Sequence, residues 1–189
     1  TKSKSTQEDA NENYLESGLL TNESKTSWAT QVGLTKDQYS VSAMVNLKYN
    51  GWSDSYFTAG SAQTGNTTNY GLRAWWRPAE TGSATPQVSV GYDYTTIADV
   101  ADTVDSTDAY FVGLNWLDIF NADDRIGIAF GQPQTREDNT ADPFMWEAYY
   151  SFKVNDSVTV TPTIFAATAA NGAAGEDYTG GVIETQFKF

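Results

Sequence analysis

The clearest pattern along the chain is an alternation of apolar and polar residues with a period of two. In segment 38–50 every second residue is apolar, and these residues are Tyr39, Val41, Ala43, Val45, Leu47 and Tyr49. The residues between them include serine, asparagine and lysine. Alternation of this kind places the apolar side chains on one face of an extended strand, whereas a helix would scatter them. Segment 38–50 is therefore predicted to be a β-strand with one apolar and one polar face.

The same alternation recurs and predicts an all-β chain. Strands are expected at 28–34, 38–50, 69–78, 87–95, 109–118, 125–131, 146–154, 158–168 and 178–189. Segment 158–168 is the least strand-like, because Pro162 cannot donate a hydrogen bond to a neighbouring strand. No segment has a convincing helical period. We therefore predict nine antiparallel strands.

The expected connections alternate in length. Shorter ones fall at 35–37, 78–86, 118–123 and 155–157, and longer, largely polar or acidic ones at 51–66, 96–107, 132–144 and 169–177. Outer-membrane β-barrels have short turns on the periplasmic side and long loops on the outer side. On this interpretation residues 1–27 form an outer loop and residues 28–189 form the strands and loops of a transmembrane barrel.

Aromatic residues on the apolar faces gather towards the strand ends, with aliphatic residues mostly between them. These aromatic residues are Tyr39, Tyr49, Tyr70, Trp76, Tyr94, Tyr110, Trp116, Phe130, Trp146, Phe152 and Phe187. Two aromatic belts around an aliphatic band are typical of a protein that meets both membrane–water interfaces. The core of a soluble β-sandwich also alternates, but it has no reason to sort its aromatic residues to strand ends.

The polar faces carry the charged residues of the strands. With Trp75, they are predicted to line a pore: Lys48, Arg73, Arg77, Asp93, Arg125, Glu147, Lys153, Glu184 and Lys188. Arg73, Trp75 and Arg77 share one face of one strand and are expected to form a basic strip. The structural alternative is that these charges pair with their neighbours. Six of these nine charged residues are basic, whereas the formal charge of the whole chain is −13. The excess of acidic residues therefore lies outside these strand positions, and the loops are strongly acidic.

Composition excludes several kinds of chemistry. The chain has no histidine and no cysteine, which excludes disulfides, Cys/His metal sites and His-dependent catalysis. The acidic balance argues against nucleic-acid binding. Asp99, Asp102, Asp105 and Asp108 lack the EF-hand pattern and are interpreted as a solvated acidic loop. We expect no metal, no cofactor and no enzymatic activity, although an Asp- or Lys-based barrel enzyme stays open.

Several stretches resemble the C-terminal half of cyanobacterial outer-membrane porins that carry an SLH domain, the iron-uptake type within the carbohydrate-selective OprB-like porin superfamily. These stretches are "YGLRAWWRPAETGSATPQVSVGYDY", "VGLNWLDIF", "IGIAFGQP", "FMWEAYYSFKVNDSVTVTPTIFAAT" and "GGVIETQFKF". The resemblance covers most of 67–189, whereas residues 1–66 match more loosely. The last strand, with Phe187 and Phe189, also looks like the assembly signal of bacterial outer-membrane barrels.

The resemblance implies an integral protein of the bacterial, cyanobacterial outer membrane. It would be a homotrimer of about sixteen-stranded barrels that passes small hydrophilic solutes and ions. The SLH domain, which would bind cell-wall polysaccharide, and the first half of the barrel are expected to lie outside this chain. Residues 1–27, with Leu19 and Leu20, are a candidate constriction loop. The alternative function is a soluble all-β carbohydrate-binding module that uses exposed tryptophan.

Overall fold

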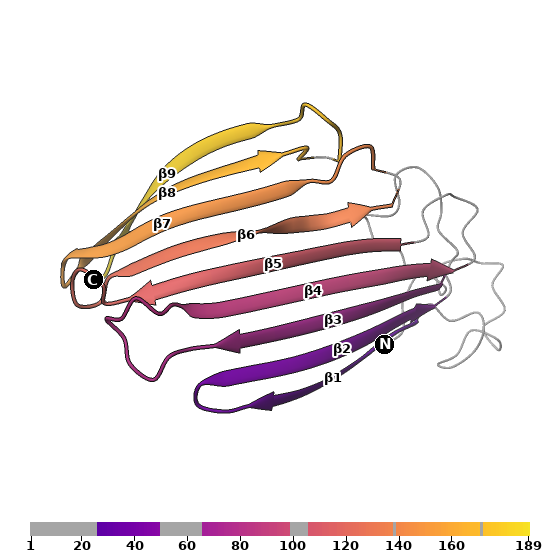
Figure 1. Cartoon of the computed structure of the whole chain (residues 1–189), viewed down its shortest axis with the longest axis horizontal. Helices are drawn as coiled ribbons and strands as arrows, with labels where there is room; N and C mark the ends of the chain where they lie inside the picture. Colours follow the sequence, from indigo (N-terminus) through magenta and orange to yellow (C-terminus); the bar gives the residue numbers. More distant parts are fainter. Residues whose placement is uncertain (1–25, 50–65, 99–105, 138, 171) are drawn as a thin grey trace.

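The computed structural model describes residues 26–49, 66–98, 106–137, 139–170 and 172–189. These residues form one antiparallel sheet of nine strands, each paired with the next along the chain (Figure 1). The strands are β1 (Thr26–Thr35), β2 (Tyr39–Tyr49), β3 (Asn66–Trp76), β4 (Gln87–Ala98), β5 (Ser106–Leu117), β6 (Arg125–Arg136), β7 (Phe144–Asn155), β8 (Val158–Thr168) and β9 (Tyr178–Phe187). The all-β prediction and its nine strands are confirmed, and the described ranges contain no helix.

The sheet is open, with β1 at one edge and β9 at the other (Figure 1). Within the described ranges, β1 pairs only with β2 and β9 pairs only with β8. Because every neighbouring pair is antiparallel and the number of strands is odd, β1 and β9 run in the same direction. A direct pairing of these two edges would therefore be parallel. None of the described residues belongs to a helix that is long and apolar enough to cross a membrane.

The strand register keeps the apolar residues on one face of the sheet. Val45 of β2 lies opposite Tyr70 of β3, which in turn lies opposite Tyr94 of β4. Farther along, Val112 lies opposite Phe130, and Phe130 opposite Trp146. Because side chains alternate with a period of two, one such pair fixes the orientation of a whole strand pair. We call the two surfaces the apolar face and the polar face.

Two prolines lie where the pairing is interrupted. Pro133 falls in a register shift of β6, because Tyr110 pairs with Gln132 whereas Asp108 already pairs with Thr135. Pro162 lies in β8, where pairing with β7 stops after Thr163 and resumes at Val160. Both places suit proline, which has no N–H group to donate to a ladder. The strand prediction for 158–168 is confirmed despite its proline.

The expected alternation of loop lengths is weaker than predicted. The connection between β4 and β5 takes only residues 99–105, fewer than the 77–86 connection at the other end of the sheet. Some strands, such as β3 at 66–68 and β6 at 132–136, continue into stretches that are polar on both faces and so show no alternation. Side chains hold these extensions together: Thr95 Oγ1 donates to Asn69 Oδ1 (2.8 Å), and Gln134 Nε2 donates to Thr107 Oγ1 (3.1 Å).

The 118–124 connection is built around the carboxylate of Asp124, which is only 1% exposed. Its two oxygens accept hydrogen bonds from the backbone N–H groups of Ile119 (2.9 Å), Phe120 (3.0 Å) and Asn121 (2.9 Å). The Tyr150 hydroxyl donates a further bond (3.1 Å). Burial raises the pKa of Asp124, but these donors outweigh it and hold the pKa below its ordinary value. A single ionised side chain thus satisfies a turn that would otherwise leave its amides unpaired.

Three aromatic rings of the polar face lie against glycines of the neighbouring strand. Phe111 faces Gly91, Tyr149 faces Gly127, and Phe165 faces Gly180, each directly across a strand pair. A Cβ atom at any of these three glycines would overlap the ring opposite. Because glycine has no side chain, each ring can pack directly against the backbone of the neighbouring strand.

We predict that Gly127→Ala lowers the free energy of unfolding by about 1–3 kcal/mol, the usual cost of overpacking. The added methyl group would collide with the Tyr149 ring, whose hydroxyl is anchored on Asn115 Oδ1 at 3.2 Å. Gly113→Ala is the matched control, because its Cβ would meet Ser89 at an ordinary 3.8 Å. Denaturant titration of both variants is the measurement. Equal effects of the two substitutions would contradict the ring-on-glycine packing.

We also predict that the 118–124 turn loosens in acid. Because the pKa of folded Asp124 is lowered from 3.8, its stabilisation is present above that value and is lost as the pH falls through the folded pKa. In Asp124→Asn, the amides of Ile119, Phe120 and Asn121 should exchange hydrogen faster at neutral pH, with little further change in acid. Asp142→Asn, an exposed acidic residue in the 137–143 connection, should leave these protection factors unchanged. If the three amides kept their protection from hydrogen exchange in Asp124→Asn, the proposed role of the carboxylate in the turn would be wrong.

Candidate functional site

The structure separates the predicted site residues into two sets by face. All eleven predicted belt aromatics lie on the apolar face, as their register partners show: Tyr39, Tyr49, Tyr70, Trp76, Tyr94, Tyr110, Trp116, Phe130, Trp146, Phe152 and Phe187. The predicted pore-lining residues within strands lie on the polar face: Lys48, Arg73, Trp75, Asp93, Arg125, Glu147, Lys153 and Glu184. Arg77 and Lys188 lie just beyond the ends of β3 and β9.

Arg73 is bound to several neighbouring groups of the sheet. One guanidinium nitrogen forms an ion pair with Asp93 of β4 at 2.5 Å, and both side chains are about half exposed (44% and 45%). The other terminal nitrogen donates to the backbone oxygens of Leu72 and Tyr92, at 2.8 and 3.1 Å. The guanidinium also lies 5.8 Å from the centre of the Phe111 ring. The structural alternative, pairing with a neighbour, therefore holds for Arg73.

Arg77 is positioned differently from Arg73. Its Nε donates to the backbone oxygen of Asp37 at 2.7 Å, and its guanidinium lies 5.3 Å from the centre of the Trp75 ring. Among the described residues no carboxylate forms an ion pair with Arg77. The predicted basic strip is thus reduced to one positive charge, at the end of the sheet where the 36–38 and 77–86 connections meet.

A second ion pair joins Lys153 of β7 to Asp123 of the 118–124 connection, at 2.7 Å. Asp123 has a positive φ of 65°, a conformation that aspartate tolerates. Its place beside Lys153 depends on how the turn folds, so the alternation of the strands did not reveal it. Within the described residues, at least Arg73 and Lys153 of the six predicted basic residues are therefore neutralised by a carboxylate.

A row of amide and hydroxyl side chains crosses the polar face and was missed by the sequence analysis. It runs across the first six strands through Ser27, Asn46, Asn69, Thr95, Thr107 and Gln134. Ser27 Oγ donates to Asn46 Oδ1 at 3.0 Å, and Asn69 Nδ2 donates to the Asn46 backbone oxygen at 3.3 Å. A cavity of about 280 Å³ lies along the row. The row is uncharged and hydrogen-bonded, as suits a wetted surface.

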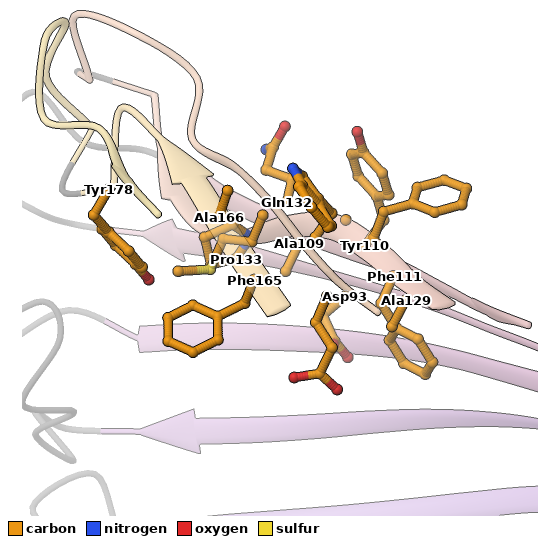
Figure 2. A pocket seen from close by; sticks show the side chains of 15 residues that line it. Asp93, Ala109, Tyr110, Phe111, Ala129, Gln132, Pro133, Phe165, Ala166 and Tyr178 are labelled. Carbon is orange, nitrogen blue, oxygen red and sulfur yellow. The ribbon is translucent and has the colours of Figure 1, made fainter. Parts of the chain in front are cut away.

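Beside this row the polar face holds an apolar hollow of about 500 Å³, which we call the aromatic basin. Its side chains on the polar face include Phe111, Met145, Phe165 and Tyr178, with Glu147 among them. Figure 2 shows Phe111, Asp93 and Phe165 on one side of the sheet, whereas Tyr110 and Gln132 point to the other. The sequence analysis did not single out these rings, because the meeting of strands far apart in sequence cannot be predicted from alternation.

Several predicted features lie wholly or partly outside the described residues. Leu19 and Leu20 of the candidate constriction loop belong to 1–25, and Asp99, Asp102 and Asp105 belong to 99–105. Asp108 is described, and its Oδ2 accepts a hydrogen bond from Gln132 Nε2 at 3.1 Å. In the part of the chain that the structure describes, no group of three or more acidic side chains could hold a metal ion.

No protein-family model, curated protein or solved structure is significantly similar to the chain. The resemblance to cyanobacterial SLH-domain porins therefore stays a prediction.

Proposed function

We propose that the chain forms part of the wall of an outer-membrane porin, a water-filled channel for passive diffusion of small hydrophilic solutes and inorganic ions. The observation that carries this proposal is the exposure of large apolar side chains across the apolar face. Val41 and Leu72 are each 54% exposed, Ile164 is 56% exposed and Ile183 is 72% exposed. Soluble monomers rarely expose contiguous apolar patches larger than a few hundred Å². Such an apolar face would be stable in contact with the hydrocarbon of a lipid bilayer.

Strand length and side-chain chemistry support the same reading. The strands have 10 to 12 residues, close to the roughly 9–11 residues that a tilted strand needs to cross a bilayer. Trp76 ends β3 on the apolar face, with the aliphatic Leu72 and Ala74 before it, as expected at a membrane interface. Tyr70 lies nearer the middle of the strand than predicted, because β3 begins four residues before it, at Asn66. On the opposite face, paired charges and the row of amides and hydroxyls suit contact with water.

The open edges indicate what else the wall requires. Unpaired backbone groups of β1 and β9 would be too costly in hydrocarbon, so a membrane-embedded sheet must close. Because these two strands run in the same direction, antiparallel closure needs an odd number of further strands, which lie outside the described residues. The family resemblance suggests the source, the first half of a larger barrel, and a homotrimer in the cyanobacterial outer membrane.

The alternative, a soluble carbohydrate-binding module, requires that something else cover the apolar face. In a β-sandwich this would be a second sheet packed about 10 Å away. The described residues form a single sheet, with no second layer over the apolar side chains. The porin is therefore the function that the geometry favours.

The absence of cysteine from the chain allows a direct test of the channel. In the full-length protein, reconstituted in planar bilayers, Met44→Cys on the polar face should react with a charged thiosulfonate reagent. The conductance should then fall stepwise, because the bulky adduct narrows the pore. Val45→Cys, one residue along on the apolar face, should not react, since neither the reagent nor a thiolate is stable in hydrocarbon. The same full-length protein without the introduced cysteine is the control.

Equal reaction at both positions would place the two faces in the same solvent and contradict the proposal. Reaction at Met44→Cys without any change in conductance would show that the polar face does not line a conducting pore.

A further inference from the structure

We propose that the aromatic basin binds small organic cations that combine an ammonium group with an apolar body. The site belongs to the polar face itself and does not require a conducting channel. It is formed by Phe111 of β5, Met145 and Glu147 of β7, Phe165 of β8 and Tyr178 of β9. Its volume of about 500 Å³ falls in the range of small-molecule sites.

The rings present their faces, which is the first requirement for binding a cation. Phe111 and Phe165 each lie on a glycine across the strand pair, so the backbone covers one side of each ring. Phe111 is nevertheless 42% exposed, and Tyr178 is 45% exposed. Tyr178 meets Phe165 edge to face, with ring centres 6.3 Å apart. An aromatic face carries partial negative charge and attracts a cation placed over it.

The protein itself provides an example of this contact. The guanidinium of Arg73 lies 5.8 Å from the centre of the Phe111 ring, at the border of the basin. Arg73 is at the same time bound to Asp93, so that carboxylate is already occupied. The arrangement at Phe111, a cation over a ring with a carboxylate beside it, is the one that a bound ammonium ion would adopt at Phe165.

Glu147 supplies the matching carboxylate. It lies directly opposite Phe165 on one side and Ala129 on the other, and its side chain is exposed. Among the described residues Glu147 has no hydrogen-bond or ion-pair partner. An unpaired negative charge beside an aromatic face favours a cation over both an anion and a neutral molecule.

The scarcity of polar groups in the basin argues against a sugar as the preferred ligand. A sugar presents many hydroxyl groups, and each one left without a partner on binding would cost affinity. Most of the side chains that face the basin are alanine, phenylalanine, methionine or proline. An aryl-alkyl ammonium ion needs only one polar partner, and Glu147 provides it.

The test is equilibrium binding of phenethylammonium to the full-length protein in nonionic micelles, measured by calorimetry with protein-free micelles subtracted. Phenethyl alcohol and phenylacetate are probes of the same size with neutral and negative charge. We expect the ammonium to bind most tightly and phenylacetate least. Glu147→Gln should weaken ammonium binding roughly two- to fivefold and leave alcohol binding unchanged. Phe165→Leu, which keeps the apolar volume but removes the ring, should weaken it similarly.

Glu80→Gln makes the same chemical change in the exposed 77–86 connection and should have no effect. Equal binding of the ammonium and phenylacetate would overturn the proposal, as would an unchanged affinity in both Glu147→Gln and Phe165→Leu. Tighter binding of glucose than of phenethylammonium would do the same. Conductance is not part of this readout, so failure of the site would leave the porin proposal standing, and binding by a non-conducting protein would leave the site standing.

Discussion

The cross-strand register, kept in phase from β1 to β9, decides which side chains share a face. A slip of one residue between any two strands would turn the apolar set of one strand to the polar side. The two register shifts lie at strand ends, near Pro133 of β6 and near Asn155 of β7. The central part of the sheet, which carries Val45, Leu72 and Ile128, is thereby left in phase. Both the apolar face and the polar face follow from this constraint.

The polar face is more structured than a charged wall. Arg73 and Lys153 are each paired with a carboxylate, so these two cations add little net positive charge to the polar face. Beside these pairs, the polar face holds the uncharged row of amides and hydroxyls that begins at Ser27 and the largely apolar aromatic basin around Phe165, which contains the carboxylate of Glu147. A solute moving over this face would meet water-like hydrogen-bonding groups on one side and ring faces on the other.

The strands could be predicted because their chemistry repeats with a simple period. The extensions at 66–68 and 132–136 could not, because a strand that is polar on both faces has no period to detect. The pairing of Arg73 with Asp93 needs the register between β3 and β4, which a single sequence does not contain. The role of Asp124 depends on the path of a turn. The rings of the aromatic basin come together only because β5 to β9 lie side by side in the sheet.

The two faces of the sheet are assigned to different solvents, one to lipid and one to water. The most direct measurement is the free energy of folding into lipid bilayers for Val45→Arg and Met44→Arg, neighbours on opposite faces of β2. Val45→Arg should cost about 2–4 kcal/mol if its position is near the bilayer midplane, because an arginine there faces hydrocarbon. Met44→Arg should cost far less, because its side chain reaches water. Equal destabilisation by the two substitutions would contradict the assignment of a lipid face and a water face.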